Sequence, residues 1–100
     1  MTNKTEQVAK PLFIPLCRDP YERFRAGEKQ HEYRIYGPRW NERTCAVGRQ
    51  VVLSLGYGKQ SRMLGKITSF RRSSDKPEWW SRYFANKSGD VAQIGIEVIR

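Results

Sequence analysis

Short segments, each bounded by glycine, proline or other turn residues, limit the fold more than any other feature of this 100-residue chain. Five of them have the alternating or continuous apolar pattern of strands, at 11–17, 30–36, 50–56, 62–70 and 91–99. Two others, at 19–26 and 73–84, contain an Asp followed three residues later by a Glu, which is typical of a capped helix start. The order of these segments lacks the regular strand–helix alternation of a parallel sheet. We therefore expect the α+β class, with a small, mostly antiparallel sheet and two short helices.

Closure of the sheet into a barrel would remove its exposed edges, so we expect a small β-barrel whose openings the helices cover. Pro15 cannot donate a hydrogen bond within a sheet, which places the first strand at an edge. The strands at 50–56 and 62–70 are expected at the centre. Residues 11–100 are expected to form one domain, because chains of this length usually do. Residues 1–10 are polar and lack a period, so we expect them to be a flexible leader.

The sequence also predicts where each helix begins and ends. Asp19 is the expected N-cap of the first helix, Pro20 its first residue, and Gly27 the left-handed residue that ends it. Asp75 is the expected cap of the second helix. Neighbours on a helix point about 100° apart, so one member of the tryptophan pair at 79–80 is expected in the core and the other nearer the surface.

Composition excludes several classes of protein. The chain lacks an apolar run of about 18 residues, and its N-terminus lacks the apolar core of a secretory signal, so we expect a cytoplasmic protein. Cys17 and Cys45 are far apart and have neither a second close cysteine nor a run of histidines beside them. We therefore expect no metal and no cofactor, with both cysteines as ordinary thiols in a reducing compartment.

The charge balance points to an anionic partner. The chain has 19 Lys+Arg and 10 Asp+Glu, and the difference is a net charge of +9. Such a surface attracts nucleic acid or anionic lipid. The basic residues do not line one face of a long amphipathic helix, so a membrane surface is not expected. A solvated basic surface without a partner is the remaining alternative.

The segment 30–36 places ionisable residues together. Its alternation puts Glu32 and Arg34 on one side, with Lys29 immediately before the strand. These three groups are either a surface ion network or a preorganised polar pocket. The other side of the strand is more apolar, and we expect it to face the core; it carries His31, Tyr33 and Ile35.

The same segment resembles a known family. Gly27, Lys29, Glu32 and Arg34 fill the pattern G-x-K-x-x-E-x-R of the ASCH domains of the PUA-like superfamily. The strands VGRQVVL and LGKITSF are similar to two glycine-led strands of that family, although Arg49 stands where the family usually has Asp. The likeness extends over roughly residues 12 to 100, judged from the order of elements. It implies a PUA-like β-barrel with a cleft beside the motif strand, in a family proposed to bind RNA or modified nucleobases.

Some relatives in that superfamily are enzymes. The bacterial acetylcytidine amidohydrolases are similar in this segment and use the motif lysine, a threonine three residues later and a downstream glutamate. This chain keeps the lysine as Lys29, has Glu32 in the place of the threonine, and offers Glu78 as a later acid. If the protein is an enzyme, Lys29 and Glu32 are the expected catalytic residues.

As a binding site, the same residues suit a base. Glu32 can accept hydrogen bonds from an exocyclic amine, while Lys29 and Arg34 hold a phosphate or a carbonyl oxygen. Trp40, next to Arg39, is either a stacking platform for a base or a loop tryptophan folded over the mouth of the barrel. Candidate contacts to a nucleic-acid backbone are Arg43, Lys59, Arg62, Arg71, Arg72 and Lys76.

Three hypotheses on function follow. The favoured one is a domain that binds RNA or a modified nucleobase in the Lys/Glu/Arg cleft, with the basic surface along the backbone. The second is a hydrolase acting on an acylated nucleoside or on RNA. The third is a protein-interaction domain that blocks a nucleic-acid-like surface on a partner.

Overall fold

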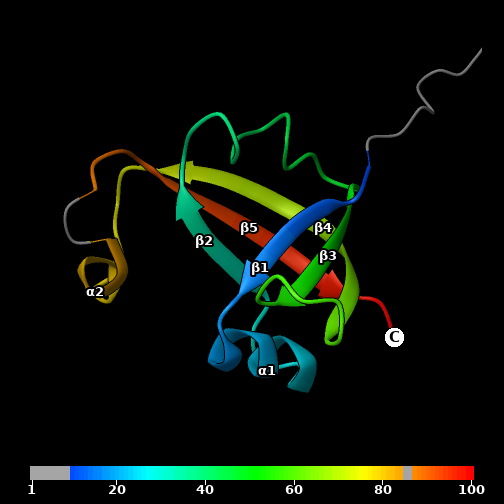
Figure 1. The fold of residues 1–100 in the computed structure, drawn as a ribbon. Coiled ribbons are helices and arrows are strands. Elements are labelled where there is room, and N and C mark those ends of the chain that lie inside the picture. The colour runs from blue at the N-terminus through cyan, green and yellow to red at the C-terminus, as the bar shows by residue number, and fades with distance from the viewer. Residues whose placement is uncertain (1–9, 85–86) are drawn as a thin grey trace, which may run out of the picture.

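The computed structural model describes residues 10–84 and 87–100. Most of the expected leader at 1–10 lies outside the described residues; the carbonyl of Lys10 accepts two hydrogen bonds from the Arg49 guanidinium. In chain order the elements are β1 Leu12–Leu16, α1 Arg18–Ala26, β2 His31–Ile35, β3 Gln50–Leu55, β4 Arg62–Ser73, α2 Trp80–Phe84 and β5 Val91–Val98 (Figure 1). Both helices of the described chain are too short to cross a membrane.

The strands form a single mixed sheet. Its five strands lie in the order β1-β3-β4-β5-β2, with β1 parallel to β3 and the other three pairs antiparallel. The first strand is at an edge, and β3 and β4 are interior, as the sequence predicts. The opposite edge is β2, the strand that carries the sequence motif.

The sheet curls into a half-barrel, and the expectation of a closed barrel is wrong. Its edge strands β1 and β2 do not pair with each other within the described chain; Figure 1 shows that β1 ends and β2 begins beside α1. The curl is helped by a bulge in β4 between Ile67 and Ser69, because a bulge bends a strand and increases its twist. Gly95 lies opposite this bulge, where an added Cβ would collide with the Ser69 hydroxyl. Pro15 on β1 offers no N–H for a further ladder at this edge.

Both helix starts differ from the prediction. The N-cap of α1 is Cys17, without a side-chain cap bond, and Asp19 lies inside the first turn, where it pairs with Arg23 at 3.0 Å. The N–H groups of the first turn have no partner in the helix, so the proline at 20 suits several of these positions and does not fix the start. Gly27 ends the helix with φ +81°, as expected. Asp75 lies five residues before α2 and is not its cap; its N–H is bonded to the Ser73 hydroxyl instead.

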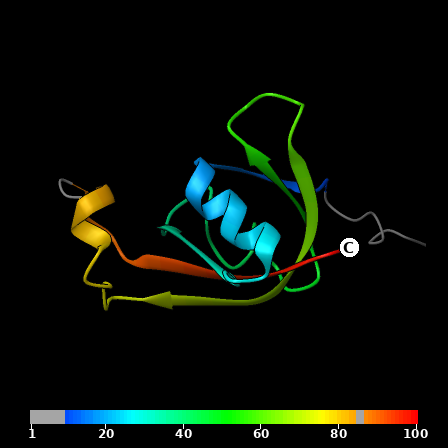
Figure 2. The same ribbon diagram turned by 90° about the horizontal axis from the view of Figure 1, so that it is seen from below.

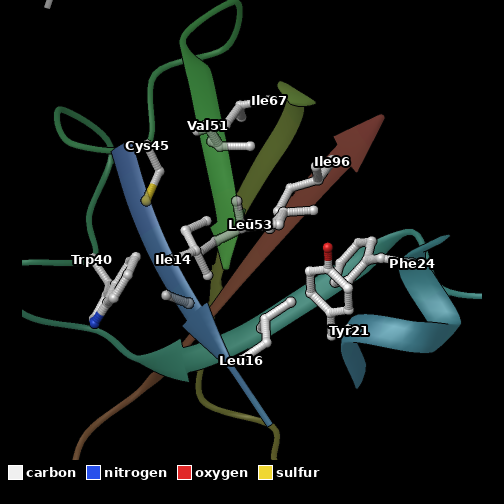
Figure 3. Packing of buried hydrophobic residues seen from close by; sticks show 12 residues of the cluster. Ile14, Leu16, Tyr21, Phe24, Trp40, Cys45, Val51, Leu53, Ile67 and Ile96 are labelled. Carbon is white, nitrogen blue, oxygen red and sulfur yellow. The ribbon is translucent and has the colours of Figure 1, made fainter. Parts of the chain in front are cut away.

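The core fills the concave side of the half-barrel (Figure 3). Alternating residues of the strands point into it, among them Ile14, Leu53 and Ile67, all fully buried. One end is covered by α1, with Tyr21 and Phe24, and the loop before β3 adds a further set of buried side chains: Trp40 and Cys45. Helix α2 stands apart from α1, at the far end of β4 and β5 (Figure 2).

Candidate functional site

The motif strand β2 has its polar face turned inward. Glu32 pairs with Ile94 and Arg34 with Ala92 in the antiparallel ladder to β5, and both β5 residues are fully buried on the concave side. Cross-strand partners lie on the same face of a sheet, so Glu32 and Arg34 share the concave face with the core. The face expected inside is therefore outside, and it carries His31, Tyr33 and Ile35.

A shared carboxylate holds the three motif side chains together. Arg34 Nε donates to Glu32 Oε2 at 2.9 Å, and Lys29 Nζ lies 3.7 Å from Glu32 Oε1. Glu32 is only 9% exposed. A carboxylate at that depth needs partners to offset its loss of hydration, and the two cations supply them. The structure thus brings the predicted group together as a partly buried network.

Arg34 also joins the two free edges of the half-barrel. Its Nη2 donates to the Pro15 carbonyl of β1 at 2.7 Å, on the side of β1 that β3 leaves free. Its guanidinium carbon lies 4.8 Å from the centre of the Trp40 ring. One side chain therefore connects β2, β1 and the Trp40 loop, where a closed barrel would have a ladder of hydrogen bonds.

Trp40 is buried under two arginines. It is 8% exposed, and Arg39 lies over the ring at 5.3 Å as Arg34 does at 4.8 Å. A base could reach this ring only by displacing one of them. The geometry favours the second interpretation of this residue, a loop tryptophan packed over the mouth of the sheet. Arg39 itself is exposed.

Lys29 borders a surface hollow of about 630 Å³, which we call the Lys29 hollow. The hollow lies between the end of α1, at Phe24 and Gly27, and the end of β5. It exists because β2 pairs with β5 only over Val91–Gly95, so the last part of β5 has no neighbouring strand on that side. The Lys29 ammonium is 5.5 Å from the ring centres of both Phe24 and Tyr33.

The predicted backbone contacts do not form one patch. Lys59 and Arg62 lie at the turn between β3 and β4, whereas Arg71, Arg72 and Lys76 lie at or beyond the other end of β4. β4 has 12 residues, which gives about 40 Å between its ends. Two of these cations already have partners: Arg72 pairs with Asp90 at 2.7 Å, and Arg62 donates to the Gly58 carbonyl at 3.1 Å. All are exposed, as is Arg43 in the Trp40 loop.

Sequence reasoning missed three residues of the Lys29 hollow. Gln30, Lys66 and Arg100 line it together with Lys29, although they come from the residue before β2, from β4 and from the last position of the sequence. The only signal in the sequence was the polar position of Lys66 in the alternating segment 62–70. Conversely, Glu78 precedes α2 at the opposite end of β5, so the structure does not bring it to Lys29.

The residues present do not suggest a metal centre. The described chain has no group of three or more His, Cys, Asp or Glu side chains placed to hold an ion. Cys45 is fully buried, and burial raises the pKa of its thiol. It therefore has the properties of a core residue and not those of a nucleophile.

Comparisons with known proteins bear on the fold. No protein-family model matches the chain, and no curated protein matches its sequence significantly. Among solved structures, the crystal structure of hypothetical protein PH0355 matches with a TM-score of 0.66 at 20% sequence identity. The match covers 87% of this chain and 97% of the other. The two chains therefore share this curled half-barrel fold over most of their length.

Proposed function

We propose that this protein is a PUA-like domain of the ASCH type that binds RNA or a nucleotide, with the base at the Lys29 hollow. One observation carries the proposal: a hollow of about 630 Å³ has on its wall a lysine that is backed by a buried carboxylate. Binding sites for small molecules usually have volumes of about 300–1,000 Å³ and a few convergent polar groups.

The chemistry of the wall suits a base. In the described residues Glu32 Oε1 has one ionic contact, the long one of 3.7 Å to Lys29. That oxygen can accept from an exocyclic amine once Lys29 turns toward the ligand, and the ammonium can then donate to a ring carbonyl or a phosphate. Arg34 is committed to Glu32 and Pro15, so in this proposal it positions the carboxylate.

The charge of the chain supports a polyanionic ligand. A net charge of +9 attracts phosphates at long range, and the exposed arginines on both ends of β4 extend the attraction beyond the hollow. The surface cations then contribute mostly to rate and salt dependence, while the hollow selects the ligand.

The test is a titration of a labelled 12-nucleotide single-stranded RNA at two salt concentrations. Affinity should fall steeply with salt, because phosphate contacts release counterions. Lys29→Ala should weaken binding at least about tenfold, a loss of about 1.4 kcal/mol. The matched control is Lys87→Ala, an exposed lysine outside the hollow, with a change below about twofold. Binding that is absent at low salt, or indifferent to salt, contradicts the proposal.

The hydrolase hypothesis receives no comparable support. Lys29 lies beside a carboxylate and over two aromatic rings, contacts that suit a cation more than a nucleophile. Glu32 stands in place of the threonine, and Glu78 is at the other end of β5. We therefore propose binding and no chemical step.

A further inference from the structure

The Lys29 hollow carries more positive than negative side chains. Its wall contains Lys29, Lys66 and Arg100 but a single acid, Glu97. The three cations come from separate segments that meet only because β4 and β5 pair in this register, with Lys66 opposite Glu97. Their convergence is therefore a property of the fold and not of a local charge run.

Two of these cations have no carboxylate partner. Within the described chain, neither Lys66 nor Arg100 lies within salt-bridge distance of an acid. Arg100 donates one hydrogen bond, from Nη2 to the Phe24 carbonyl at 3.3 Å, which fixes the side chain against α1 and leaves its other donors for a ligand. Lys29 is the third cation and shares Glu32 with Arg34.

The edge of β5 adds a backbone donor. The N–H of Ile96 bonds the Gln30 carbonyl on the β2 side, and the N–H of Ile99 bonds the Leu64 carbonyl on the β4 side. Successive N–H groups of a strand alternate between its two neighbours, so the N–H of Val98 points to the β2 side. β2 pairs only as far as Gly95 there, so this N–H faces the hollow.

From these groups we infer that the Lys29 hollow binds the phosphate of its nucleotide through Lys66, Arg100 and the Val98 N–H. A guanidinium, an ammonium and a backbone N–H are the usual donors to phosphate oxygens. The inference rests on the proposed function and narrows it. The ligand is a phosphorylated nucleotide or a nucleotide within RNA, and a free base or nucleoside binds poorly.

The test compares ligands that differ only in the phosphate. Cytidine, cytidine 5′-monophosphate and inorganic phosphate are titrated into the ¹⁵N-labelled protein, with the amide signals of Gln30, Ile96 and Val98 as the readout. The monophosphate should bind at least about tenfold more tightly than cytidine, a difference of about 1.4 kcal/mol. Inorganic phosphate should shift the same signals at higher concentration, since it lacks the base.

Two double variants that remove the same charge distinguish phosphate binding in the hollow from long-range attraction by the net positive charge of the chain. Lys66→Ala with Arg100→Ala should remove most of the preference for the monophosphate and leave the affinity for cytidine unchanged. Arg82→Ala with Lys87→Ala removes the same charge outside the hollow and should keep that preference. All four side chains are exposed, so the fold should persist.

The outcomes distinguish the two proposals. Equal affinity for cytidine and its monophosphate, or equal loss in both double variants, overturns the phosphate site and leaves a base-binding hollow. If no probe shifts the signals of the hollow, the phosphate site is overturned, and the RNA titration decides separately whether the protein binds RNA at all.

Discussion

Charged side chains on the two faces of the sheet differ in what stabilises them. On the concave face, Glu32 and Arg34 lie among apolar side chains, and each has a fixed partner. On the convex face, Arg71 and Gln93 lie beside Tyr33, and Arg71 is exposed to water. Desolvation makes partners obligatory inside, whereas outside the charges are hydrated and free to meet a ligand or a solvent ion.

The convex face also has a small core of its own. Val91 is 2% and Trp80 4% exposed, yet neither belongs to the main cluster. Trp80 lies 4.2 Å from the Phe84 ring, and Trp79 makes an edge contact with Tyr33 at 5.2 Å. This aromatic group lies beside α2. The convex face is therefore stabilised by aromatic packing, whereas the concave face combines apolar packing with an ion network.

The largest expected effect comes from breaking the concave network. Glu32→Ala leaves Arg34 and Lys29 partly buried without their carboxylate, and the free energy of unfolding should fall by about 4 kcal/mol. Urea unfolding measures the change. Glu22→Ala, which removes an exposed carboxylate of α1 with two arginine partners, is the control and should cost less than about 1 kcal/mol. Equal losses in the two variants would show that Glu32 is no more buried in solution than Glu22.

The next effect tests the convex core. Trp80→Ala removes a buried tryptophan of this aromatic group, and the expected loss in unfolding free energy is about 3 kcal/mol. Its neighbour provides the control: Trp79→Ala removes a half-buried ring with edge contacts, and about 1 kcal/mol is expected. Urea unfolding followed by circular dichroism compares them. A larger loss for Trp79 than for Trp80 would contradict the assignment of Trp80 to the core.

A smaller effect isolates the geometry of Arg34 from its charge. Arg34→Lys keeps a cation for Glu32 but cannot reach Pro15 and stack on Trp40 at the same time, so about 2 kcal/mol should be lost. Arg23→Lys on α1 exchanges the same groups at an exposed pair with Asp19 and should change stability by less than about 0.5 kcal/mol. If Arg34→Lys is as stable as the unmodified protein, the side chain does not brace the edges.

The alternation of residues along the sequence predicted which side chains of β2 share a face. Alternation showed that Glu32 and Arg34 share a face, because side chains of a strand point in turn to either side. It did not show which face is inside, since that depends on the register of β2 on β5, a segment far away in sequence. Apolarity favoured the side of Tyr33, whereas the structure places Glu32 and Arg34 inside, where each has a hydrogen-bond partner.

The Lys29 hollow was beyond local rules for a related reason. Lys66 meets Lys29 only through the register of β4 on β5 and the early end of β2. Neither register nor strand length follows from periodicity, which specifies a face but not a partner. The strand at the edge could be predicted because proline acts on its own backbone, and Pro15 lies on β1 as expected.

The smallest effect lies at the rim of the concave face, where the sheet opens to water. The Tyr36 hydroxyl donates to Glu42 Oε1, and this bond lowers the pKa of Glu42 and raises the pKa of Tyr36. Because the pKa of Glu42 is lower in the folded state, the bond stabilises the fold at pH values above the unfolded-state pKa. This stabilisation is lost as pH falls through the folded-state pKa. Because the pKa of Tyr36 is higher in the folded state, the bond stabilises the fold at pH values below the unfolded-state pKa. This stabilisation is lost as pH rises through the folded-state pKa.

The bond between Tyr36 and Glu42 therefore stabilises the fold at pH values between the titration of the carboxyl and that of the phenol. Exposure to water keeps this stabilisation small. Tyr36→Phe removes the donor, so the pKa of Glu42 should rise toward its ordinary value, while stability at neutral pH changes little. Carboxyl-carbon NMR over an acid titration follows Glu42 directly, with Tyr57→Phe, an exposed tyrosine that packs on Phe13, as the control. An unchanged pKa of Glu42 in Tyr36→Phe would show that Glu42 at the rim is hydrated and does not depend on Tyr36. Fixed partners for charged groups would then be limited to Glu32 and Arg34 in the interior of the concave face.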